Sequence, residues 1–87
     1  MTVLVVCAVR DQKLDAFLRP FVMPSKGAAI RSFGDEVNRK AEDNPMNAHP
    51  EDYALWSLAM FDDTTGTFVE AKMQLALASD FKVNKGD

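Results

Sequence analysis

Hydrophobic residues along this chain fall into several short runs typical of strands and one run with helical spacing. Residues 2–10 are apolar at nearly every position, so both faces of the expected strand are hydrophobic. Such a strand belongs in the middle of a sheet whose two sides are both covered. Residues 16–23 predict a second strand, and one of its faces would carry Phe17, Arg19, Phe21 and Met23. Because Pro20 has no N–H group, this strand should lie at an edge or be broken.

One main helix is expected over about residues 26–43. Ser25 is its expected N-cap, because a serine hydroxyl can accept a hydrogen bond from a free amide of the first turn. The apolar stripe of this helix consists of Ile30, Phe33, Val37 and Ala41. Asn44-Pro45 should end the helix, since proline disfavours helical geometry at the residue before it. The opposite face carries oppositely charged pairs at i,i+4 spacing, namely Arg31–Asp35–Arg39 and Glu36–Lys40.

The second half of the chain predicts a hairpin. Residues 45–52 read as a polar connection, and residues 52–61 and 67–70 as strands that flank the turn Asp62–Gly66. Residues 73–78 alternate again and would add a final strand. The whole is expected to be one α+β domain over residues 1–81, with an antiparallel or mixed sheet of four to five strands and one helix packed on one face. The polar tail 82–87 is expected to fray.

The number of layers predicts self-association. The strands expected at 2–10 and 52–61 are apolar on both faces, but the chain supplies only one substantial helix to cover the sheet. The uncovered face must be buried by closure of the sheet or by a second subunit. We therefore expect a homodimer.

Charge is distributed unevenly over the 87 residues. The net charge is −3, which argues against strong, indiscriminate affinity for DNA. Residues 1–40 hold seven basic and four acidic side chains, a net +3, whereas residues 41–87 hold three basic and nine acidic ones, a net −6. This asymmetry indicates either a basic binding face or two surfaces that attract each other.

Several features indicate a cytoplasmic protein. The single cysteine, Cys7, lies in an apolar run, where it reads as a core residue that needs no oxidising compartment. The apolar residues 2–9 are too few to span a bilayer. They also lack the basic leader and the cleavage site of a signal peptide.

Residues for catalysis or metal binding are sparse. His49 is the only histidine, and no second histidine, cysteine pair or glycine-rich phosphate loop accompanies it. Its position before Pro50 fits a turn that enters a strand. The acidic turn Asp62–Gly66 lacks the ligand spacing of a calcium loop. We expect no enzyme activity, no cofactor and no metal site.

The best candidate for DNA binding is the expected edge strand with its neighbouring basic residues. Two aromatic rings that flank Arg19 can stack on bases while the guanidinium meets phosphate. The candidate nucleic-acid-binding residues are Lys13, Phe17, Arg19, Phe21, Lys26 and Arg31. In the competing interpretation the two phenylalanines pack under the helix, because a chain this small needs its aromatic residues for the core. Arg31 would then belong to the ion pairs of the helix surface.

Two blocks of sequence resemble one phage family. The first block comprises Asp15–Phe21, Pro24, Gly27–Phe33 and Asp35–Arg39, and the second comprises His49–Tyr53, Leu55, Leu58, Phe61–Asp63, Thr65–Gly66 and Phe68. Over about residues 15–69 the chain is similar to the non-structural accessory protein of the gokushoviruses, small single-stranded-DNA phages of the Microviridae. This resemblance implies a role in handling DNA, by helping the switch to single-strand synthesis or genome packaging.

The expected function is therefore that of a non-enzymatic phage accessory protein in the host cell cytoplasm. It would bind single-stranded DNA without sequence specificity through its basic N-terminal half. The alternative is a protein–protein adaptor, which would engage a viral assembly component or a host replication factor through its acidic half and exposed apolar positions.

Overall fold

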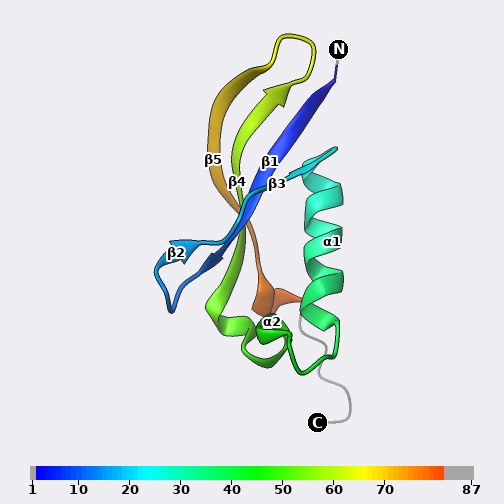
Figure 1. Ribbon diagram of the computed structural model, residues 1–87. Coiled ribbons are helices and arrows are strands. Elements are labelled where there is room, and N and C mark those ends of the chain that lie inside the picture. The colour runs from blue at the N-terminus through cyan, green and yellow to red at the C-terminus, as the bar shows by residue number, and fades with distance from the viewer. Residues whose placement is uncertain (1, 82–87) are drawn as a thin grey trace.

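The protein is a twisted antiparallel sheet with one long helix against one face, as the computed structural model shows for residues 2–81 (Figure 1). The α+β prediction is confirmed. The elements follow one another as β1 (Val3–Asp11), β2 (Ala16–Phe17), β3 (Phe21–Met23), α1 (Lys26–Asn38), α2 (Pro45–Ala48), the 3₁₀ turn η1 (Pro50–Asp52), β4 (Tyr53–Asp62), β5 (Thr67–Leu77) and the 3₁₀ turn η2 (Ala78–Asp80). The expectation for the tail 82–87 lies outside the described residues.

Within the described part of the chain the sheet has five strands, in the order β2-β1-β4-β5, with β3 also paired to β1. Every pairing is antiparallel. The hairpin prediction is confirmed: Gly66 has a positive φ of 72°, and its N–H donates to the carbonyl of Asp62 at 2.8 Å. The separate strand expected over residues 73–78 is wrong, because β5 runs without interruption to Leu77.

The expected strand at residues 16–23 is broken at Pro20 and lies at the sheet edge, as predicted. Its two pieces face opposite ways. Phe17 pairs with Arg10 of β1, and Phe21 pairs with Cys7. Arg10 and Cys7 are an odd number of positions apart along a strand, so they point to opposite faces. The prediction that Phe17 and Phe21 share a face is therefore wrong.

Helix α1 begins as expected and ends early. The Ser25 hydroxyl accepts the N–H of Ala28 at 3.1 Å, which confirms the N-cap. The helix stops at Asn38 instead of near residue 43, because the buried Asn44 side chain reaches back and donates to two carbonyls at the helix end. These are the carbonyls of Glu36, at 2.8 Å, and Arg39, at 2.7 Å.

The early end of α1 alters the segment between it and β4. Ala41, expected on the apolar stripe, lies outside the helix and is exposed. Arg39 was expected to pair with Asp35. It binds Glu36 at 2.8 Å and Asp43 at 3.6 Å instead. The expected polar connection contains α2, whose N-cap is again Asn44: its carboxamide oxygen accepts the N–H of Met46 at 3.2 Å.

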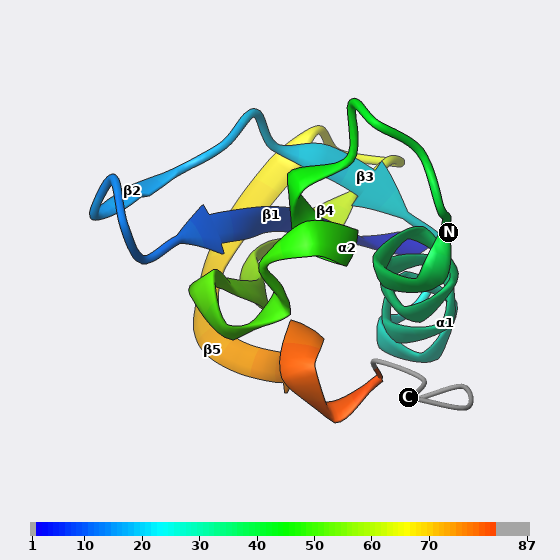
Figure 2. The same ribbon diagram turned by 90° about the horizontal axis from the view of Figure 1, so that it is seen from below.

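The core fills the space between α1 and one sheet face. Its buried members are Val5, Cys7, Val9, Ala29, Phe33, Val37, Tyr53, Leu55 and Ala78. Turn η2 lies beside α1 (Figure 2). The ring of Phe81, which follows this turn, meets that of Phe33 edge to face, with the ring centroids 6.0 Å apart. Cys7 is fully buried, which confirms it as a core residue, and burial raises the pKa of its thiol. No helix within residues 2–81 has the length and hydrophobicity required to cross a membrane.

Candidate nucleic-acid interface

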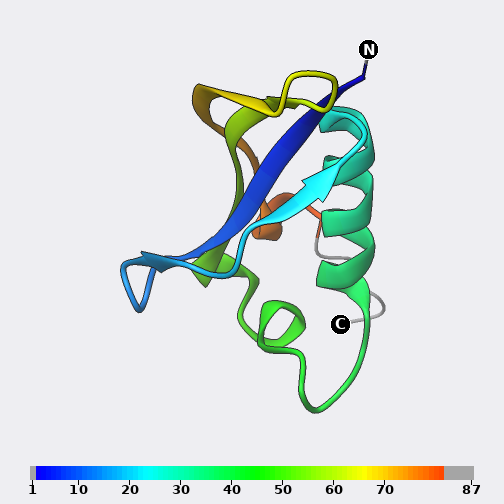
Figure 3. The same cartoon turned by 45° about the horizontal axis from the view of Figure 1, so that its top comes forward.

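Among residues 2–81, no helix covers the sheet face opposite α1 (Figure 3). Val5, Cys7 and Val9 of β1 point to the core, so the alternation of the strand sends Leu4, Val6, Ala8 and Arg10 to this open face. Strand pairing extends β1 into cross-strand rows, which are Leu4–Phe61–Phe68, Val6–Ala59–Glu70 and Ala8–Trp56–Gln74. The open face is therefore largely apolar and aromatic.

Four side chains from four different strands meet at one end of the open face. The rings of Phe17 and Trp56 lie edge to face, with their centroids 5.8 Å apart. The Nζ of Lys72 lies 5.5 Å from the Phe17 centroid and 5.9 Å from the Trp56 centroid. The guanidinium carbon of Arg10 lies 5.2 Å from the Phe17 centroid. We call these four residues the aromatic–cation cluster. Both cations are within the range at which they are attracted to an aromatic face.

The β1–β2 turn holds further charges beside this cluster. The carboxylate of Asp11 accepts the N–H groups of Lys13 at 3.0 Å and Leu14 at 3.2 Å, which fixes the turn. Asp15, with a positive φ of 55°, closes the turn and forms an ion pair with Arg10. The ion pair offsets part of the positive charge of the cluster. The side chain of Lys13 stays exposed.

Trp56 is half-buried, and its indole nitrogen is an unusual polar group. Nε1 is shielded from solvent and has no hydrogen-bond acceptor within residues 2–81. A buried donor left without an acceptor costs about 1–3 kcal/mol. Phe17 and Lys72 contact the Trp56 ring. Within the described residues, the Trp56 N–H is therefore an unpaired donor beside the aromatic–cation cluster.

The structure divides the residues proposed from sequence into two groups. Phe17 belongs to the aromatic–cation cluster, and Lys13 and Arg19 are exposed on the segments next to β2. The second group consists of Phe21, Lys26 and Arg31. Phe21 packs against the core, as the competing interpretation held. Lys26 and Arg31 belong to α1, on the other side of the sheet, and Nζ of Lys26 lies 3.6 Å from Sδ of Met73.

Sequence reasoning missed Arg10, Trp56 and Lys72. Trp56 and Lys72 lie in the acidic half of the chain, and pairing of β4 with β1 and β5 brings them to the basic half. The positive charge of residues 1–40 therefore does not map onto a single face. One signal was present in the sequence, because Trp56 and Lys72 lie on the two sides of the expected hairpin. The break expected between residues 70 and 73 concealed that Lys72 belongs to the strand next to Trp56.

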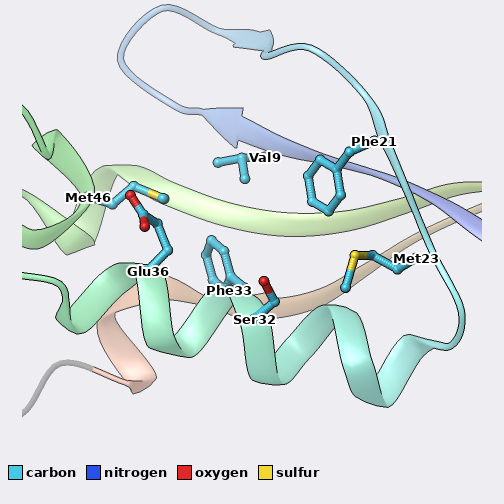
Figure 4. Close-up of a pocket in the computed structure, with 7 residues that line it drawn as sticks. All are labelled: Val9, Phe21, Met23, Ser32, Phe33, Glu36 and Met46. Atoms are coloured by element: carbon cyan, nitrogen blue, oxygen red, sulfur yellow. The ribbon is translucent and has the colours of Figure 1, made fainter.

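An apolar cleft of about 300 Å³ opens on the helix side, between α1, α2 and the β1–β3 pair (Figure 4). Its lining residues are Val9, Phe21, Met23, Ser32, Phe33, Glu36 and Met46. Among these described lining residues, Glu36 alone is charged. Its carboxylate accepts two hydrogen bonds from Arg39, both at 2.8 Å, and these hold the pKa of Glu36 below its usual value.

Several polar side chains also lie close together around η1. Ligand atoms of His49, Glu51 and Asp52 all lie within 4.8 Å of one another, and Nδ1 of His49 is 3.9 Å from a carboxylate oxygen of Glu51. His49 links α2 to η1 just before β4, the turn position expected for it. Exposed acidic groups commonly gather in this way without an ion, so the cluster carries no functional assignment.

Comparison with known proteins places the chain in a family. No curated protein and no solved structure matches it. A family model described as "Phage ORF5 protein" matches residues 4–81, which takes in α1, α2 and every described strand apart from Val3, the first residue of β1. The chain belongs to this family of small phage proteins.

Proposed function

We propose that this phage protein is a non-enzymatic accessory protein that binds single-stranded DNA without sequence specificity, in the cytoplasm of the host cell, during genome synthesis or packaging. The observation that carries the proposal is the aromatic–cation cluster on an open sheet face. Membership of a phage family agrees with it. The narrower assignment to the gokushoviruses rests on the two sequence blocks, both of which lie within the matched residues 4–81.

The cluster combines the two interactions on which nonspecific single-strand binding depends. Aromatic side chains stack on bases whatever their identity, because every base has a π face. Cations beside the rings meet the phosphates. In this mechanism a phosphate draws the exposed ammonium of Lys72 away from the rings of Phe17 and Trp56. The rings then become accessible to a base, and the Trp56 N–H gains an acceptor.

The same face offers a second stacking position near the β4–β5 turn. The rings of Phe61 and Phe68 lie 4.7 Å apart, and Phe68 is 65% exposed. Along β4, Phe61 is five residues from Trp56, roughly 16 Å at the rise of a strand. The extra β4 residue at the register shift opposite Val6 and Cys7 turns both rings to the same face despite this odd spacing. An extended strand of several nucleotides can therefore contact both aromatic positions without leaving the sheet.

Electrostatics predict moderate, salt-sensitive affinity. Arg10, Lys13, Arg19 and Lys72 are the cations at the cluster end of the sheet, whereas Asp15 neutralises part of their charge. Three or four phosphate contacts at about −0.7 each give a slope of log affinity against log salt of about −2 to −3. We further propose that the protein acts as a homodimer, because two linked weak sites raise avidity without new contacts.

The fluorescence of Trp56 provides a direct test, because it is the only tryptophan in the chain. Unlabelled oligothymidylate added at low salt should quench this fluorescence saturably, and the midpoint should move to higher DNA concentration as salt rises. Unchanged fluorescence together with no change in oligonucleotide anisotropy at low salt would contradict the proposal.

A protein–protein adaptor is the second candidate, and the apolar cleft favours it. Two methionines and two phenylalanines line the cleft. Flexible methionine side chains adapt to apolar partner residues of varied shape. Under this function the partner is a viral assembly component or a host replication factor that inserts an apolar side chain between α1 and β3. A failed oligonucleotide titration with a folded protein would favour it.

A further inference from the structure

The two edges of the sheet differ in their capacity to pair with another strand. One edge consists of the short strands β2 and β3, separated by Pro20. The other is β5, eleven residues long and the last strand of the sheet path. A long outer strand presents a row of N–H and C=O groups that can template pairing with another chain. Only Glu70 and Lys72 carry charge along β5.

We propose that β5 pairs antiparallel with β5 of a second copy, in a register centred on Ala71. This register places Glu70 opposite Lys72 of the second copy, and two-fold symmetry repeats the pair. Registers centred on Glu70 or Lys72 would instead oppose like charges, which destabilises a strand pair. The sequence of β5 is thus complementary to itself in one register.

The backbone around Ala71 fits this pairing. The Ser57 hydroxyl donates to the carbonyl of Ala71 at 2.6 Å, so that carbonyl turns inward to β4. The register of β5 on β4 shifts by one residue between Glu70 and Met73, but Val69 and Met73 both pair with core-side residues of β4, so the alternation of β5 itself continues through the shift. The backbone groups of Glu70 and Lys72 therefore turn outward, where each can exchange two hydrogen bonds with its counterpart in the second copy. The two Ala71 residues face each other as a pair without direct hydrogen bonds.

Apolar side chains next to the charge pairs add to the contact. Val69 and Met73 are 60% and 47% exposed, and the proposed register places each opposite the other across the two copies. Both lie on the α1 side of the strand: Val69 pairs with Met60, a residue packed on the core, and Met73 pairs with the buried Ser57. Pairing across the edge would cover part of both side chains.

The geometry of such a dimer leaves the open face accessible. Antiparallel strands in one sheet are related by a two-fold axis perpendicular to the sheet, so the two copies present the same face to the same side. Two aromatic–cation clusters would then share one surface of a continuous ten-stranded sheet. The pairing stands on the edge of β5 and does not depend on DNA binding.

Charge exchange tests the register. By sedimentation velocity at tens of micromolar, the protein should have twice the 9.7 kDa mass of one chain. Glu70→Lys or Lys72→Glu should each raise the dimer dissociation constant about tenfold by opposing like charges. The double variant Glu70→Lys with Lys72→Glu should restore it. Glu42→Lys and Lys40→Glu, at exposed positions after α1, are matched controls that should change nothing. A monomeric wild-type protein, or single variants that dimerise normally, would overturn the proposal.

A covalent crosslink gives an independent measurement. Facing residues without direct hydrogen bonds have Cα atoms about 4.5 Å apart, within the range of about 4.4–6.8 Å that a disulfide spans. Ala71→Cys should therefore form a disulfide dimer under mild oxidation, whereas Gln74→Cys, displaced from the centre of the register, should not. Buried Cys7 does not compete. With folding verified by circular dichroism, absence of the Ala71→Cys dimer, or equal crosslinking of both variants, would overturn the register.

Discussion

Lys72 and Trp56 meet across the β4–β5 pair, with the ammonium nitrogen 5.9 Å from the ring centroid. The same ammonium lies 5.5 Å from the Phe17 ring, so one cation spans two aromatic side chains from strands β2 and β4. This contact stabilises the free protein and also covers the surface that we propose for bases. Ligand binding must therefore replace the cation–π contact with a phosphate contact, an exchange that higher salt disfavours.

The division of basic residues between the two sheet faces gives the first prediction. Reversal of both Lys13 and Arg19, beside the cluster, should weaken oligonucleotide binding by at least about tenfold and flatten its salt dependence. Reversal of Lys26 and Arg31 makes the same change in net charge on the helix side, where it should have little effect. Anisotropy titrations at three salt concentrations measure both. Equal losses in the two double variants would show that net charge, and not the open face, controls binding.

The second prediction concerns stacking by Phe17. Phe17→Leu keeps an apolar side chain beside Trp56 but removes the ring over which Arg10 and Lys72 lie. Loss of one stacked base should cost about 1–3 kcal/mol of binding free energy. Phe21→Leu is the matched control, because Phe21 packs toward the core. Affinities of the two variants, compared at equal folded fraction, test the assignment, and a Phe17→Leu protein with wild-type affinity would contradict it.

Much of the fold follows from local sequence, whereas the site depends on strand register. Ser25, the Asp62–Gly66 turn and the apolar run of β1 act through nearby residues, and each was predicted correctly. The sheet faces on which Phe17 and Phe21 lie were not predicted correctly. Four steps along the chain from Phe17 to Phe21 oppose three steps from Arg10 to Cys7 on β1. This one-residue mismatch turns the second ring to the other face, and period-two alternation alone cannot reveal it.

The end of α1 shows the same limit. Pro45 was expected to stop the helix, but the carboxamide of Asn44 holds the carbonyls of Glu36 and Arg39 and ends it earlier. A side chain that reaches back eight residues leaves no periodic signal in the sequence. The residues Asn44-Pro45 nevertheless indicated correctly that the helix does not continue past Pro45.

Asn44 is accordingly the residue whose loss we expect to be most costly outside the apolar core. It is 3% exposed, donates to two carbonyls and accepts the N–H of Met46. Asn44→Ala leaves these groups unpaired and should lower the free energy of unfolding by about 2–3 kcal/mol. Asp43→Ala, at the exposed neighbouring position, should change it by less than about 0.5 kcal/mol. Urea denaturation measures both, and equal stabilities would refute the role given to Asn44.

Cys7 gives the final prediction, which concerns pH. Burial raises the pKa of its thiol above the usual 9.0, because desolvation penalises the thiolate. The folded protein therefore binds this proton more tightly than the unfolded chain does. The contribution to stability is complete below pH 9.0 and is lost as the pH rises toward the raised value.

A Cys7→Ala variant should accordingly lose less stability than the wild-type protein between neutral and strongly alkaline pH. The pKa of Tyr53 is also raised, first by burial and then by Asp11. Tyr53 remains in both proteins, so its contribution to the pH dependence cancels in the comparison. The same burial should make the native thiol resist a thiol reagent at neutral pH until the chain unfolds. Rapid modification of the folded protein would mean that β1 opens readily, and would contradict a core built on Cys7.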